Sequence, residues 1–241
     1  MLVVGTGGAG TAAAIRAAEL GRRVGIVEHG TVGGTCVNVG CIPSKNLLSL
    51  AARRHTARAG FAGLGGCEPS LDWPEALRHK RELIDGMRRS KYLDVLESYP
   101  AITLLRGSAR FAAGAALEID GVPQAAPRVI LATGTAPWVP PIPGIDGVDL
   151  LDSASAMEVP ELPRSLIVLG GGTVGLELGQ AFSRLGVHVT VLERLPRLLP
   201  GEHEAAASEL RRQLEAEGIE IVTGANVSRV ETGDRRVLVT V

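Results

Sequence analysis

The sequence predicts an α/β protein made of two doubly wound domains, and two observations support that prediction. Short apolar segments with the pattern of buried strands alternate along the 241 residues with longer segments of helical periodicity. One unit of strand, glycine-rich loop, helix and strand also occurs twice, at a constant offset of 165 residues. A repeat of a whole supersecondary unit indicates two similarly folded domains.

The first copy starts at the N-terminus. An apolar strand at residues 2–4 leads into the loop Gly-Thr-Gly-Gly-Ala-Gly at residues 5–10, an alanine-rich helix at residues 11–20, and a second strand that ends in Glu28. This order is the Rossmann-type dinucleotide fingerprint, in which glycines allow a tight turn, a close approach to the pyrophosphate and close helix packing. The glycines with these roles are Gly5, Gly7 and Gly10. Glu28 is expected to accept hydrogen bonds from the ribose hydroxyls.

The second copy repeats each part. Its strand at residues 166–169, its helix at residues 176–185 and its second strand at residues 187–192 are followed by Glu193. Its fingerprint glycines are Gly170, Gly172 and Gly175. Two copies predict two bound dinucleotides, one in each domain.

Between the copies, periodicity predicts a helix at residues 44–58 and a long helix or helix pair at residues 73–96. Three short strands joined by glycine turns are expected to form a small β-meander attached to the first domain, at residues 102–105, 116–119 and 128–131. A proline-rich segment follows, and the predicted domains are residues 1–155 and 156–241.

Beyond the second copy, the pattern predicts a helix at residues 203–217, a strand at residues 220–223 and a hairpin around Gly233 and Asp234. A doubly wound domain normally returns to its parallel sheet after such an excursion. We therefore expect the second domain to be incomplete.

Composition excludes several classes of function. The net charge is −1, from 25 basic and 26 acidic residues, which argues against a nucleic-acid partner or an anionic membrane surface. No apolar run reaches the roughly 18 residues of a membrane span, and the N-terminus lacks the pattern of a signal peptide. Three clustered cysteines do not form a secreted disulfide scaffold, so we expect a cytoplasmic protein.

Two of the cysteines, Cys36 and Cys41, lie together behind a glycine pair. They point to different sides of a regular helix, so a disulfide between them needs a distorted first helical turn, which Gly40 allows. Pro43 fits an early helical turn, and a helix N-terminus lowers the pKa of a nearby thiol. This pattern favours a redox pair. The alternatives are a zinc site, for which no further ligand pair is recognisable, and two inert buried thiols.

Residues 33–45, with the sequence GGTCVNVGCIPSK, resemble the active-site signature of the class I pyridine nucleotide-disulfide oxidoreductases. Residues 132–134, Ala-Thr-Gly, resemble the motif of these flavoenzymes at a strand end near the flavin. Because the two fingerprints also fall where the family has its nucleotide sites, the resemblance covers the whole chain. It implies FAD in residues 1–155 and NAD(P)H in residues 156–241, with the family's C-terminal interface domain missing.

The resemblance also assigns roles. Cys36 would be the thiol that attacks substrate and Cys41 the thiol beside the flavin, accepting electrons that pass from NAD(P)H through FAD. Lys45 and Glu177 resemble the pair that meets near flavin N5, although both also fit a plain surface lysine and acid. Further cofactor contacts are implied for Gly34, Thr35, Thr133 and Gly134.

Within the family, several segments look most similar to mercuric reductases: residues 61–64, 71–73, 91–96 and 107–111. Thiolates at positions 36 and 41 would bind Hg(II) transiently, since soft sulfur ligands prefer soft cations. The alternatives are dihydrolipoyl dehydrogenase or another dithiol reductase, and an inactive nucleotide-binding fragment. Glu193 favours NADH over NADPH, although Arg194 and Arg197 follow it and mercuric reductases are generally thought of as NADPH enzymes. A full-length member would be a homodimer.

Overall fold

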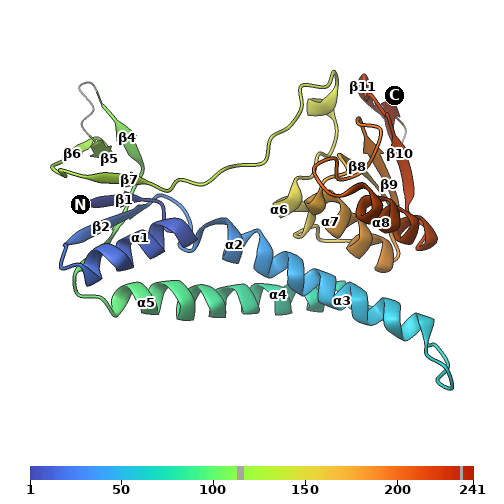
Figure 1. Ribbon diagram of the computed structural model, residues 1–241, viewed down its shortest axis with the longest axis horizontal. Coiled ribbons are helices and arrows are strands. Elements are labelled where there is room, and N and C mark those ends of the chain that lie inside the picture. The colour runs from blue at the N-terminus through green and yellow to red at the C-terminus, as the bar shows by residue number, and fades with distance from the viewer. Residues whose placement is uncertain (113–116, 234–235) are drawn as a thin grey trace. The chain divides into compact units, whose positions relative to one another are not determined.

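The computed structural model describes residues 1–112, 117–233 and 236–241 (Figure 1). The chain divides into two compact units. The first unit comprises residues 1–43 and 78–136, and the second comprises residues 44–77 and 137–241. The assignment of one cofactor to residues 1–155 and another to residues 156–241 stays a prediction.

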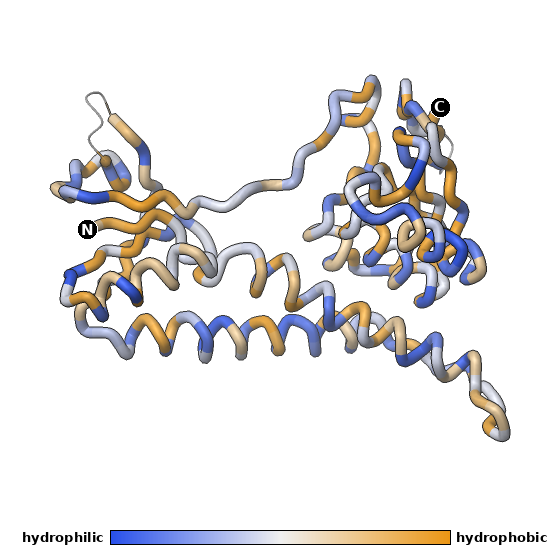
Figure 2. Tube along the Cα trace, in the orientation of Figure 1, coloured by the Kyte–Doolittle hydropathy of each residue, from blue (hydrophilic) through white to orange (hydrophobic). Residues whose placement is uncertain are grey.

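The first unit is built on a four-stranded parallel sheet with the strand order β3-β2-β1-β7. The strands are β1 (Leu2–Val4), β2 (Val24–Glu28), β3 (Ile102–Arg106) and β7 (Val129–Leu131). Helix α1 (Gly8–Glu19) joins the two central strands. Val3, Ile26 and Ala14 are fully buried between helix and sheet, and the strands are mostly apolar in Figure 2.

A separate antiparallel sheet contains β4 (Ala109–Phe111), β5 (Leu117–Ile119) and β6 (Val122–Gln124). A small meander is therefore present, but two of the three strands predicted for it lie in another sheet. The strands at residues 102–105 and 128–131 belong to the parallel sheet instead. Segments this short carry no signal for the direction of their partner strand. Residue 116, predicted to begin the second of these strands, lies outside the described residues.

Helices complete the first unit and lead into the second. The signature segment, residues 33–45, forms α2 (Gly34–Asn38) and the start of α3 (Cys41–Ala59). The predicted long helix is one helical run composed of α4 (Trp73–Arg88), a π-helical turn η1 (Arg89–Leu93) and α5 (Asp94–Glu97). Among the described residues, no helix is long and apolar enough to cross a membrane.

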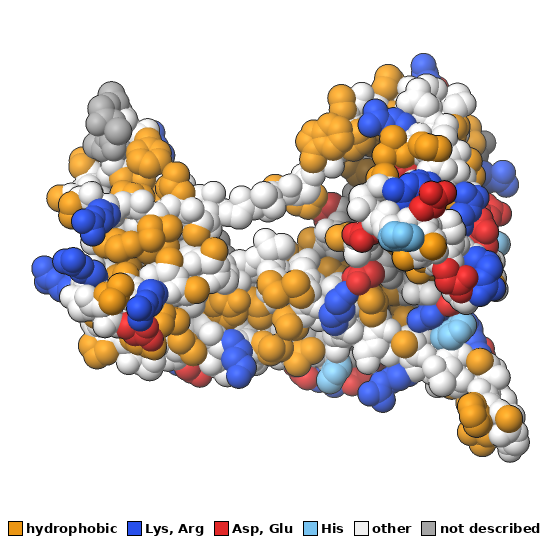
Figure 3. Space-filling model, in the orientation of Figure 1, with side chains coloured by type: hydrophobic (Ala, Val, Ile, Leu, Met, Phe, Trp, Pro, Cys, Tyr) orange, Lys and Arg blue, Asp and Glu red, His pale blue; other side chains and the backbone are white. Residues whose placement is uncertain are grey.

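The second unit has a parallel sheet with the order β10-β9-β8. Its elements are β8 (Ser165–Leu169), α7 (Thr173–Arg184), β9 (His188–Glu193), α8 (Glu204–Ala216) and β10 (Glu220–Thr223). Phe182, Leu198 and Leu214 are almost completely buried in its core, together with Leu47 of α3. Acidic and basic side chains are interspersed over the face of this unit shown in Figure 3.

Smaller elements flank that sheet. A 3-10 turn η3 (Ile145–Gly147) and the short helix α6 (Ser153–Ala156) precede it, and β11 (Arg229–Gly233) pairs with β12 (Arg236–Thr240) as an antiparallel hairpin. The predicted hairpin is therefore present, although Asp234 at its turn lies outside the described residues. The α/β class and the two Rossmann-type units are confirmed.

Candidate active site

The first fingerprint loop leaves no room for side chains at two of its glycines. Gly5 has φ +101°, and its N–H donates to the carbonyl of Val27 at 2.8 Å. A Cβ on Gly5 would lie 2.2 Å from the carbonyl oxygen of Ala132, and one on Gly10 would lie 1.9 Å from that of Gly5. Gly7 is the N-cap of α1 and has no side chain to cap it, so the first N–H groups of this helix remain suited to an anion.

The second loop repeats part of this geometry. Gly170 has φ +105°, and its N–H donates to Leu192 at 2.8 Å. A Cβ on Gly175 would lie 2.8 Å from the carbonyl oxygen of Gly170. Gly172 is the N-cap of α7, which begins and ends 165 residues after α1. Both loops therefore fit a dinucleotide pyrophosphate at a helix N-terminus.

The two glutamates that end the second strand of each copy are held in place by main-chain N–H donors. Glu28 is buried and accepts hydrogen bonds from the N–H groups of Thr6 (3.2 Å) and Gly30 (2.8 Å). Burial alone would raise the pKa of Glu28, but these bonds and one from the Thr6 hydroxyl outweigh it, so the pKa lies below its usual range. Glu193 accepts from Gly171 (2.6 Å) and Leu195 (2.7 Å). Each carboxylate ends a strand beside its glycine loop, as ribose binding requires.

Thr133 and Gly134 lie just beyond β7, after Ala132. The N–H of Ala132 donates to Val4 at 2.8 Å, which extends the pairing of β7 with β1 to the fingerprint loop. A Cβ on Gly5 would lie 3.4 Å from Thr133 Cα, and Gly134 has φ +71°. The strand-end motif therefore lies against the first glycine loop.

The cysteine pair is placed by a break between two helices. Cys36 lies in α2 and Cys41 begins α3, and the helical geometry stops between them at Val39. Both residues are exposed free thiols, hydrogen-bonded to each other. Their exposure contradicts the alternative of two inert buried thiols. Thr35, in the first turn of α2, is also exposed, and its carbonyl accepts the N–H of Val39 at 2.9 Å.

Helix α2 starts with a contact between two glycines. Gly34 has φ +64°, and a Cβ on it would lie 2.5 Å from Gly7 Cα. The start of the helix that carries Cys36 therefore packs directly on the fingerprint loop. Only glycine at position 34 permits this approach.

The pKa of Cys36 is raised, not lowered as the sequence suggested. The main cause is the hydrogen bond to the Cys41 side chain, with burial and the charge of ionised Cys41 adding to it. The Cys41 main-chain N–H, at the start of α3, acts in the expected lowering direction but is outweighed. The sequence predicted that the two thiols act as a pair, but not that their hydrogen bond raises the pKa of Cys36.

Tyr92 is a neighbour of the thiols that sequence reasoning missed. It is half-buried on the π-helical turn η1, and burial raises its pKa, with further contributions from the charges of Cys36 and Cys41. A Cβ on Gly33 would lie 3.4 Å from its ring, at Cδ2. With at least fifty residues between Tyr92 and either thiol, no local pattern could reveal the contact.

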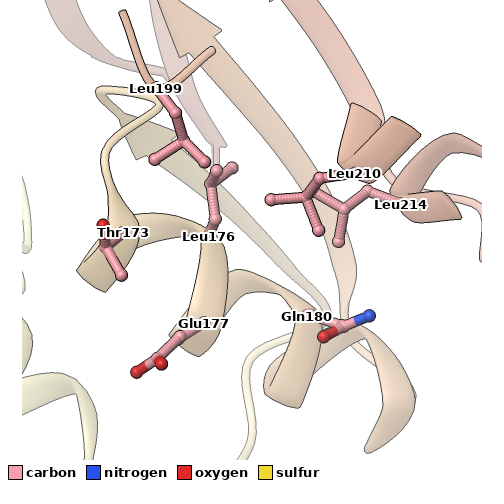
Figure 4. Close-up of a pocket in the computed structure, with 7 residues that line it drawn as sticks. All are labelled: Thr173, Leu176, Glu177, Gln180, Leu199, Leu210 and Leu214. Carbon is pink, nitrogen blue, oxygen red and sulfur yellow. The ribbon is translucent and has the colours of Figure 1, made fainter. Parts of the chain in front are cut away.

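Lys45 and Glu177 meet within the second unit. Lys45 Nζ donates to Glu177 Oε1 at 2.5 Å, with 57% and 35% of the two side chains exposed. Glu177 also borders a cavity of about 200 Å³ that is lined mainly by leucines of α7, α8 and the preceding loop. Figure 4 shows the Glu177 carboxylate pointing away from the side chains of Leu210 and Leu214. The role of the pair beside a flavin stays a prediction.

A structural metal finds no support in this part of the chain. Among residues 1–112, 117–233 and 236–241, no three His, Cys, Asp or Glu side chains are grouped closely enough to hold a metal ion.

We expect Cys41→Ala to make Cys36 more reactive at neutral pH. The substitution removes the largest cause of the raised pKa of Cys36 and keeps the N–H of residue 41, so the thiolate fraction increases. The rate of iodoacetamide labelling of Cys36 is measured by mass spectrometry from pH 6 to 10. At pH 7 the variant should be labelled about threefold faster than the wild type or more, and the midpoint of its pH profile should lie at lower pH. An unchanged midpoint would contradict this origin of the shift. Cys67→Ala serves as the control, because Cys67 is a separate exposed thiol.

Comparisons with known proteins agree with these observations. The family described as pyridine nucleotide-disulphide oxidoreductase matches residues 1–241. The chain is 38% identical to a mercuric reductase of Lysinibacillus sphaericus, covering all of this chain and 44% of that protein, and 41% identical to one of Streptomyces lividans, covering all of this chain and 52% of that protein. It is 42% identical to a dihydrolipoyl dehydrogenase of Thermus scotoductus, over 93% of this chain and 48% of that protein.

A solved structure gives the same result. The HOCl-induced flavoprotein disulfide reductase RclA from Escherichia coli matches with a TM-score of 0.86 and 31% identity, over 99% of this chain and 52% of that one. The chain thus spans about half the length of the relatives it matches. With a family match along its whole length, the fold of a flavoprotein disulfide reductase and a paired thiol at the signature, the chain belongs to the pyridine nucleotide-disulphide oxidoreductase family.

Proposed function

We propose that the protein is a flavin-dependent oxidoreductase that passes electrons from NAD(P)H through FAD to a Cys36–Cys41 disulfide, and that its substrate is Hg(II). One observation carries the proposal. The two thiols are exposed, hydrogen-bonded to each other and attached to a helix that packs by Gly34 on the Gly7 of a dinucleotide loop. The helix that carries Cys36 and the loop that would hold the nucleotide are thus in direct contact.

The first loop and Glu28 fit the ADP portion of FAD, with the N–H groups of α1 facing the pyrophosphate. When bound, FAD supplies two-electron transfer between a nicotinamide and a disulfide. The predicted contacts of Thr35, Thr133 and Gly134 lie in segments next to the same loop.

The second loop would hold NAD(P)H, and NADH is slightly favoured. The Glu193 carboxylate would accept a ribose 2′-hydroxyl and repel a 2′-phosphate. Arg197 is engaged with the carbonyls of Leu199, Pro200 and Glu202, which leaves it poorly placed to bind a phosphate. Arg194 is exposed.

The protein's own thiols would carry the substrate. The reduced pair loses two protons and forms two sulfur–mercury bonds with Hg(II), a soft cation that prefers thiolate ligands. In the net reaction, NAD(P)H and Hg(II) give NAD(P)⁺, H⁺ and Hg(0). Lys45 and Glu177 resemble the family's pair near flavin N5, and that role is part of the proposal. A full-length protein of this kind would be a cytoplasmic homodimer.

A second candidate is the reduction of a small disulfide, as in dihydrolipoyl dehydrogenase. The exposure of Cys36 favours it equally, because thiol–disulfide exchange needs an accessible attacking sulfur. An inactive nucleotide-binding fragment is the candidate of another class.

The deciding experiment is anaerobic titration of the purified chain, reconstituted with FAD, with NADH and then NADPH. Hg(II) and lipoamide are then supplied in turn, and nicotinamide oxidation is measured. Oxidation that requires Hg(II) supports the proposal, and oxidation only with lipoamide supports the second candidate. Failure to retain FAD means that the chain acts only within a longer protein.

A further inference from the structure

Thr6, the second residue of the first glycine loop, has a buried hydroxyl with two partners. Its side chain is fully buried, and Oγ1 donates to Glu28 Oε2 at 2.5 Å. The same oxygen accepts the N–H of Gly33 at 3.1 Å. Since a hydroxyl has one proton and two lone pairs, it can do both at once. The Thr6 side chain thus links Glu28, the acid expected to bind ribose, to Gly33, the residue before α2.

The second copy shows that the acid can be positioned without this hydroxyl. Gly171 stands 165 residues after Thr6, and its N–H donates to Glu193 just as the N–H of Thr6 donates to Glu28. A Cβ on Gly171 would lie 2.5 Å from the Leu198 side chain, so a side chain there would have to displace Leu198. The hydroxyl is therefore an addition in the copy that carries the thiol pair.

Gly33, which donates its N–H to this link, lies at the start of α2. Gly33 is the N-cap of the helix, with φ +105°, and a Cβ on it would lie 2.4 Å from Val37. Helix α2 has only five residues and contains Cys36 in its first turn. At its other end, Asn38 Nδ2 donates to the carbonyls of Val32 and Gly34. Such a short helix depends on these anchors for its position.

We propose that Thr6 is a positioning residue that couples the flavin-ribose site at Glu28 to the redox helix through Gly33. Loss of the hydroxyl removes one donor from the Glu28 carboxylate and leaves the buried Gly33 N–H without its acceptor. Flavin affinity and the reactivity of Cys36 therefore change together. The flavin half of this inference rests on the proposed function, whereas the thiol half does not.

The test compares three variants. Thr6→Val keeps the shape of the side chain and removes both hydrogen bonds, and Thr6→Ser restores them. Thr11→Val is the matched control, because the buried Thr11 hydroxyl donates to the Thr6 carbonyl at 2.9 Å and has neither Glu28 nor Gly33 among its hydrogen-bond partners. Two quantities are measured: the dissociation constant of FAD, from flavin fluorescence, and the rate of Cys36 alkylation in the apoprotein.

We expect Thr6→Val to weaken FAD binding about tenfold or more, since the lost bond involves a charged acceptor. Cys36 alkylation at pH 7 should become about threefold faster, because a loosened α2 weakens the hydrogen bond to Cys41 that suppresses ionisation. Thr6→Ser and Thr11→Val should stay within about twofold of the wild type in both measurements.

Two results would overturn the inference: effects of Thr6→Val no larger than those of Thr11→Val, or weaker FAD binding with unchanged Cys36 alkylation. If the wild-type chain binds no FAD, the proposed function fails for this unit. The alkylation rates then still decide whether Thr6 positions the redox helix.

Discussion

Gly10→Ala is expected to destabilise the first unit by about 3 kcal/mol or more and to abolish nucleotide binding there. The added Cβ would lie 1.9 Å from the carbonyl oxygen of Gly5, a main-chain atom that cannot rotate away. Relief requires α1 to move off β1, which displaces the helix N-terminus from the site where the pyrophosphate would bind. Urea unfolding of the wild type and the variant measures the loss, and FAD titration measures the binding.

Two matched variants make this prediction sharp. Gly8→Ala adds the same methyl group two residues earlier in α1, where a Cβ meets nothing within 4 Å, so stability should be unchanged or slightly increased by helix propensity. Gly175→Ala makes the equivalent contact in the second copy, where the added Cβ would lie 2.8 Å from the carbonyl oxygen of Gly170. It should lower the free energy of unfolding by about 1–2 kcal/mol. A Gly10→Ala variant as stable as Gly8→Ala would show that the loop is not packed as described.

Cys36→Ser is expected to lower the affinity of the reduced chain for Hg(II) by roughly 10²- to 10⁴-fold. Two thiolates held within hydrogen-bonding distance bind one soft cation as a chelate, and removal of either leaves a single ligand. The measurement is competition for Hg(II) against a monothiol of known affinity, which needs neither FAD nor NAD(P)H.

Cys67→Ser provides the control for that experiment. Cys67 is equally exposed but has no place in the signature, so its loss should leave the tight site intact. If Cys36→Ser and Cys67→Ser lower the affinity by the same factor, the pair does not act as a chelate and the Hg(II) proposal loses its chemical basis.

The repeat and the redox signature could be read from the sequence because both are local patterns. Gly5, Gly10 and Glu28 stand at the spacings of a strand–loop–helix–strand unit, and the second copy repeats them. The assignment of β3 and β7 to the parallel sheet could not be read, since strand direction depends on partners far along the chain.

The contacts that tune the thiols were also beyond the sequence. The spacing of Cys36 and Cys41 indicated a distorted helical turn, which the structure contains, but not that their mutual hydrogen bond would raise the pKa of Cys36 against the effect of the helix N-terminus. Tyr92 reaches the pair from a distant helix. Such effects depend on interatomic distances and cannot be derived from residue types and spacing.

The packing of Gly34 on Gly7 has a consequence for motion. Because only hydrogen atoms project from these α-carbons, the contact contains no rotatable side-chain bond and no alternative rotamer. Fluctuations between the glycine loop and the start of α2 are therefore limited to small displacements of the main chain. The main chain of Cys36, two residues further on, is restricted to the same small displacements. This restriction does not require the entropy loss of ordering a long side chain.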